Sequence, residues 1–139
     1  MKTGGITPLQ GWGIAIIRVV VGIVFLMHGG QKLFVWGFGG VAAFMGQVGI
    51  PAPMLAAVVV TLVEFVGGLA FLLRLFTRWF AIPLAIDMLV AIFAVHLRGG
   101  FFLPNGYEFA LTLLAANVAL ACLGSGGKSV DNLLADRQA

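Results

Sequence analysis

The chain has 139 residues, of which 61% are hydrophobic and 9% are charged, and its formal net charge is +3. Soluble domains carry about 25% charged residues because their surface faces water, so this composition excludes a water-soluble domain and predicts a membrane protein. The small, unclustered positive charge gives no support for nucleic-acid binding, and a single cysteine, Cys122, excludes an internal disulfide or a CxxC redox pair.

Four apolar segments follow one another along the chain, each close to the ~20 residues that a helix needs to cross a bilayer. They lack the alternation typical of a membrane β-barrel, and a helix satisfies its own backbone polar groups in lipid. The sequence therefore predicts an all-α membrane protein, a single four-transmembrane-helix bundle over residues 1–139. The expected spans are 12–30, 54–73, 80–97 and 107–123.

The connections between these segments contain the helix breakers. The first connection is long and apolar, and we expect a short helix on the membrane surface over residues 40–48, before the turn at Pro51 and Pro53. The third connection is rich in glycine and contains Pro104. Residues 124–139 are predicted to form a short cytoplasmic tail.

The orientation follows from the lysine and arginine residues outside the apolar segments. Five of them belong to the termini and the second connection, and two, Lys32 and Arg98, belong to the first and third connections. By the positive-inside rule, both termini are expected in the cytoplasm. We therefore predict a multi-pass protein of the bacterial inner (plasma) membrane.

Three ionisable residues lie inside the predicted spans: Arg18, Glu64 and Asp87. Such residues are costly in a membrane and usually face the bundle interior. Counted from the cytoplasmic ends of their helices, all three come to similar depths, so we expect one intramembrane charge cluster. The cluster is either a structural ion-pair network or a proton-sharing ligand site, and Arg18 alone has the further option of extending to the headgroups.

A second polar cluster is expected near the outer interface, and its members are candidate ligand-binding residues: His28, Lys32, His96, Tyr107 and Glu108. Each histidine taken alone is explained by interfacial hydrogen bonding, whereas the concentration at one depth favours a pocket. On a regular helix, His96 lies half a turn round from Asp87, so these two are not expected on one stripe. The histidines have no HxxxH-type spacing, so no metal site is predicted.

The order and spacing of several elements resemble the DoxX family of small four-helix membrane proteins from about Trp12 to Asp131. The elements are an early arginine, a His-Gly pair with a following lysine, a Gly-Ile-Pro turn, a glutamate before Gly-Gly, a Thr-Arg turn, and later acidic, histidine and Tyr-Glu positions. In this chain they are Arg18, His28–Gly29, Lys32, Gly49–Pro51, Glu64, Gly67–Gly68, Thr77–Arg78, Asp87, His96, Tyr107–Glu108 and Ser129–Asp131.

The resemblance implies a redox-linked setting. Related proteins include the membrane subunit of a thiosulfate:quinone oxidoreductase and proteins tied to oxidative stress and thiol handling. The fold is also similar to that of four-helix disulfide-forming enzymes that use quinone. This chain lacks their cysteine pairs, so their chemistry does not carry over.

Two functions from different classes stay open at this point. One is an integral membrane subunit in redox-linked or oxidative-stress processes, with a quinone as the candidate ligand held by the outer polar cluster. The alternative is a non-catalytic membrane anchor or assembly factor for a partner complex. A small-solute or proton carrier ranks last, because no inverted repeat or broken helix is visible. We expect a protein partner or a homo-oligomer in addition to the lipid bilayer.

Overall fold

The structure, a computed structural model, describes residues 5–126, and this part of the chain is helical throughout, with short connections. The elements are α1 (Pro8–Gln31), η1 (Lys32–Trp36), α2 (Gly37–Gln47), α3 (Pro53–Leu73), α4 (Thr77–Val90), η2 (Ala91–His96), η3 (Leu97–Gly99) and α5 (Glu108–Leu123). The predicted all-α bundle is confirmed, and the short helix expected in the first connection is present as α2.

The first helix begins at a capping box. The Thr7 side chain accepts from the Gln10 backbone N–H, and the Gln10 side chain accepts from the Thr7 N–H, while Pro8 occupies the first turn. α1 continues without a break into the π-helical segment η1. At Gly37, φ is +66°, a conformation that suits glycine, and the chain turns there into α2.

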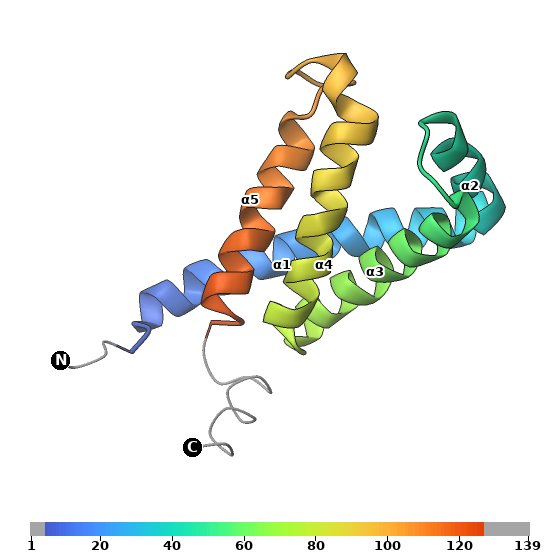
Figure 1. Ribbon diagram of the computed structural model, residues 1–139. Helices are drawn as coiled ribbons and strands as arrows, with labels where there is room; N and C mark the ends of the chain where they lie inside the picture. The colour runs from blue at the N-terminus through green and yellow to red at the C-terminus, as the bar shows by residue number, and fades with distance from the viewer. Residues whose placement is uncertain (1–4, 127–139) are drawn as a thin grey trace.

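The arrangement consists of two antiparallel helix pairs that cross (Figure 1). α1 packs along α3, and α4 packs along α5. α2 packs against the first part of α3, at the end of the α1–α3 pair far from the termini. Gly126 contacts Gly11 and Ile14, so the two ends of the described chain lie at the same end of the bundle, as the topology prediction requires.

Glycines set the close approach of α1 and α3. A Cβ on Gly29 would lie 2.7 Å from the Cα of Phe65, and one on Gly68 would lie 2.7 Å from the carbonyl oxygen of Gly22. In lipid there is little hydrophobic force between helices, so small residues that allow backbone contact drive association. This glycine seam fixes the register of α1 against α3.

The outer surface is apolar, as lipid contact requires. Leu9, Trp12, Phe34 and Trp79 are all largely exposed. The helical stretches Pro8–Gln47, Pro53–Leu73 and Thr77–Gly99 are long and apolar enough to cross a membrane. α5 is apolar but has 16 residues, about 24 Å of helix, so the fourth crossing is shorter than the other three.

Candidate functional site

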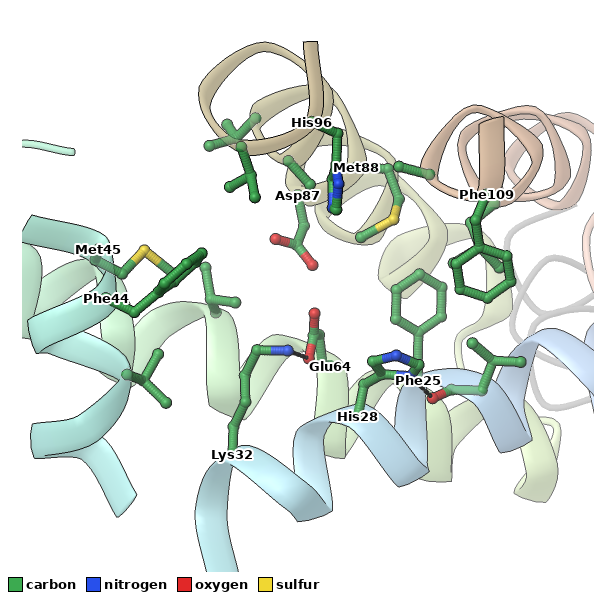
Figure 2. A pocket seen from close by; sticks show the side chains of 18 of the residues that line it. Phe25, His28, Lys32, Phe44, Met45, Glu64, Asp87, Met88, His96 and Phe109 are labelled. Atoms are coloured by element: carbon green, nitrogen blue, oxygen red, sulfur yellow. Dashed lines mark hydrogen bonds and ion pairs between the residues drawn. The ribbon is translucent and has the colours of Figure 1, made fainter. Parts of the chain in front are cut away.

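A cavity of about 350 Å³ lies between the two helix pairs and is closed at one side by α2 (Figure 2). Its walls are mainly apolar, and a group of ionisable side chains faces into it. The apolar lining includes Val24, Phe25, Trp36, Val41, Phe44, Met45, Met88, Ala91, Phe109 and Leu113. The ionisable lining residues are His28, Lys32, Glu64, Asp87 and His96. A small number of polar groups in an apolar cavity of this size is the usual composition of a small-molecule site.

An ion pair joins η1 to α3 at one side of the cavity. The Nζ of Lys32 lies 2.5 Å from Oε2 of Glu64, and their side chains are 15% and 6% exposed. The Lys32 and Glu64 side chains reach toward each other from two different helices (Figure 2). Buried charges need a partner, and the partner of Glu64 is therefore Lys32.

Asp87 extends from α4 toward Glu64, so two carboxyl groups face each other across the cavity (Figure 2). The charge of Lys32 also acts on Asp87. One oxygen of Asp87, Oδ2, is buried and has no hydrogen-bond partner. Two carboxyl groups therefore share one ammonium group, and Asp87 Oδ2 is left as an unpaired polar atom in the wall of the cavity.

A π-helical segment brings His96 onto the same face as Asp87. The sequence-based expectation that these residues lie on different stripes is wrong, because it assumed regular α-helix. Residues 91–96 form η2, whose wider turns advance fewer degrees per residue. The angular offset between Asp87 and His96 is therefore well below the half turn of a regular helix, and both side chains line one cavity. π-Helical turns are often found at functional sites.

Both histidines use one ring nitrogen on the protein's own backbone. Nδ1 of His28 lies 2.9 Å from the carbonyl oxygen of Val24, and Nδ1 of His96 lies 3.3 Å from that of Asn105. A carbonyl oxygen only accepts, so each Nδ1 carries the proton. The ring of His28 also lies near that of Phe109, with centroids 6.2 Å apart.

Arg18 does not lie with Glu64 and Asp87, so the prediction of one cluster of all three residues is wrong in its placement of Arg18. Its guanidinium donates to the carbonyl oxygen of Phe71, near the end of α3. The depth argument assumed that the helix ends are level, whereas α1 extends past the end of α3. Arg18 is buried, and its positive charge lies at the carbonyl end of α3, where the helix dipole favours a cation.

Tyr107 and Glu108 lie outside the cavity lining and organise the third connection. The Glu108 carboxylate accepts from the backbone N–H of Leu103 at 2.8 Å, and the Tyr107 ring packs edge-on against Phe101. These contacts hold residues 101–107 over the cavity end, where Leu103 contributes to the lining. Tyr107 and Glu108 therefore act on the cavity only through the third connection, which they hold in place.

Sequence reasoning did not identify the apolar walls of the cavity. Phe44 and Met45 come from α2, and Met88 and Phe109 come from the second helix pair. Their only sequence signal is the unusual apolarity of the first connection, since any apolar residue in a span is equally consistent with lipid contact. Within residues 5–126, no three His, Cys, Asp or Glu side chains come together as a metal site.

Comparison with known proteins places these features in a family. The family model described as DoxX matches residues 13–97, which cover most of α1 and all of η1, α2, α3, α4 and η2. No solved structure is similar enough to count as a match.

Several curated proteins are similar over most of their length. A Bacillus subtilis protein named "Putative oxidoreductase CatD" is 33% identical over 86% of this chain and 84% of its own length. An uncharacterized membrane protein of Mycobacterium tuberculosis is 36% identical over 89% of this chain and 82% of its own. The Escherichia coli inner membrane protein YqjF is 32% identical over 91% of this chain and 95% of its own.

Proposed function

Since the chain belongs to the DoxX family of membrane proteins, we propose that it is an inner-membrane subunit that binds a quinone-type ligand in a redox-linked process. The cavity is the observation that carries this proposal. It combines apolar, aromatic walls with five ionisable side chains, and it lies within helices that face lipid. A quinone is itself an apolar, membrane-dissolved molecule with a small polar ring, so the two match in chemistry.

The site residues of the proposal are those whose polar atoms face the cavity. Lys32, Glu64, Asp87, His28 and His96 would contact the polar ring. Phe25, Phe44 and Phe109 supply aromatic surfaces that suit a flat ring, which gains from stacked or edge-on packing. The name of the Bacillus subtilis relative contains the word oxidoreductase, which supports a redox setting.

A partner protein belongs to the proposal. Electron transfer to or from a bound quinone needs a second redox group, and the described helices supply an apolar cavity with acid–base side chains. We expect the second group on a partner oxidoreductase that docks at the membrane. The chain would then be the quinone-binding subunit of a larger membrane complex.

Native mass spectrometry of the protein, gently extracted from its own membranes, tests the proposal. We expect a bound quinone, with occupancy lost in Glu64→Gln and His96→Phe and kept in the surface control Arg98→Gln. A protein that carries phospholipid alone, or a quinone occupancy that is the same in all variants, would refute the proposed site.

The alternative function, a non-catalytic anchor or assembly factor, is favoured by one observation. The Lys32–Glu64 ion pair and the glycine seam join the same two helices, as a purely structural lock would. In that case Glu64→Gln lowers stability and partner binding together. A stable Glu64→Gln protein that keeps its partner and loses only its ligand would argue against the anchor.

A further inference from the structure

The hydrogen-bond donors and acceptors that line the cavity indicate which redox form of the ligand the cavity fits. We propose that the site recognises the reduced, hydroxyl-bearing form, a hydroquinone, in preference to the oxidised quinone. This inference rests on the proposed function and deepens it by naming the ligand form. It concerns binding alone and involves no electron-transfer step.

Each of the two histidines keeps one ring nitrogen as an unpaired acceptor. In each ring Nδ1 donates its proton to a backbone carbonyl, Val24 for His28 and Asn105 for His96. A neutral imidazole carries one N–H, so Nε2 is left as an acceptor. Neither Nε2 has a hydrogen-bond partner in residues 5–126. A quinone carbonyl, which also only accepts, has no proton to receive from these rings.

The carboxyl groups of the cavity add a further unpaired acceptor. Asp87 Oδ2 is buried without a partner and faces the cavity with Glu64 (Figure 2). The one strong donor in the lining, Lys32, already lies 2.5 Å from Glu64 and is attracted to both carboxylates. Glu64 therefore engages one of the three N–H groups of Lys32, while the two histidine Nε2 atoms and Asp87 Oδ2 are acceptors that residues 5–126 leave unpaired.

Complementarity decides the consequence. A hydroquinone has two O–H donors on opposite sides of the ring, whereas its quinone has two carbonyl acceptors and no donor. An acceptor placed against an acceptor leaves both desolvated and unpaired, which costs affinity.

The magnitude follows from the number of bonds. One ordinary hydrogen bond is worth about fivefold in affinity, so two bonds that only the hydroquinone can donate predict a preference of roughly twenty-five-fold. For a two-electron couple, each tenfold preference for the reduced form raises the midpoint potential of the bound couple by about 30 mV.

The test is anaerobic calorimetric titration of the full-length protein in nanodiscs with three ligands that share one decyl tail. They are a decyl-1,4-benzoquinone, its hydroquinone, and the di-O-methyl ether of that hydroquinone, which keeps the ring and loses both donors. We expect the hydroquinone to bind at least tenfold more tightly than the other two. His28→Phe and His96→Phe should each reduce this preference about fivefold, and Arg98→Gln, an exposed residue outside the lining, should leave it unchanged.

The outcomes separate the two proposals. Equal affinity for the three ligands, tighter binding of the quinone, or a preference that survives both histidine substitutions would overturn the hydroquinone inference and leave quinone binding intact. Failure of all three ligands to bind would overturn the proposed function itself and this inference with it.

Discussion

Replacing Lys32 with methionine isolates the ion pair at the centre of the site. The substitution keeps the length and apolar volume of the side chain and removes its charge, leaving Glu64 buried and unpaired. At the observed 2.5 Å and an effective dielectric constant of about 20, the pair attraction is roughly 7 kcal/mol. Relaxation of the site reduces this value, and breaking a buried pair typically costs about 3–5 kcal/mol. We expect Lys32→Met to lower the free energy of unfolding by about that amount.

The double variant Lys32→Met, Glu64→Gln should recover most of the loss, since it removes both charges and leaves none unpaired. The assay is unfolding by SDS titration of the purified protein in mild detergent, followed by far-ultraviolet circular dichroism. Arg98→Met is the matched control, because it removes an exposed cation and should change stability by less than about 0.5 kcal/mol. The reasoning fails if Lys32→Met is no more destabilising than this control, or if the double variant is the less stable of the two.

Three further predictions use the same unfolding assay. Gly29→Ala should lower the free energy of unfolding by about 1–3 kcal/mol, because its Cβ would lie 2.7 Å from the Cα of Phe65 in α3. Gly13 has open space around it, so Gly13→Ala should be neutral or stabilising. Equal effects of the two substitutions would contradict the glycine seam. Asn117→Leu should raise stability by about 1 kcal/mol, since the fully buried Oδ1 of Asn117 has no partner, and a clear loss would show that this amide has an unrecognised role. Asp87→Asn should also stabilise the protein, because it relieves the repulsion between the carboxyl groups of Asp87 and Glu64, and it should weaken ligand binding. A destabilised variant would mean that Asp87 holds the bundle together.

The fold was largely predictable because lipid imposes a simple rule on the sequence. Apolar runs of helical length give the positions of the helices, and the apolar first connection indicated the short helix α2. The predicted bounds of the helices were less accurate than their positions. The third predicted span, 80–97, proved to be α4, η2 and η3 together, from Thr77 to Gly99. The sequence carries no signal for a change from α- to π-helical turns.

The site was predicted in its residue types and not in its arrangement. His28, Lys32 and His96 were expected together, and the structure does bring them to one cavity. Glu64 and Asp87 were assigned to a separate inner layer with Arg18, whereas they lie with the histidines. Two physical facts escape helix counting: the register of α1 on α3, which backbone contacts at glycines decide, and the phase shift that η2 introduces.

Photolabelling with an azido-quinone in native membranes tests the central claim, that this cavity holds the ligand, most directly. We expect the label on residues 24–45 and 88–113, which contribute most of the cavity walls. Ala91→Phe, which fills the cavity, should abolish labelling, while Ala115→Phe, on the exposed face of α5, should not. Label spread evenly over the lipid-facing surface, or equal labelling of both variants, would contradict the account.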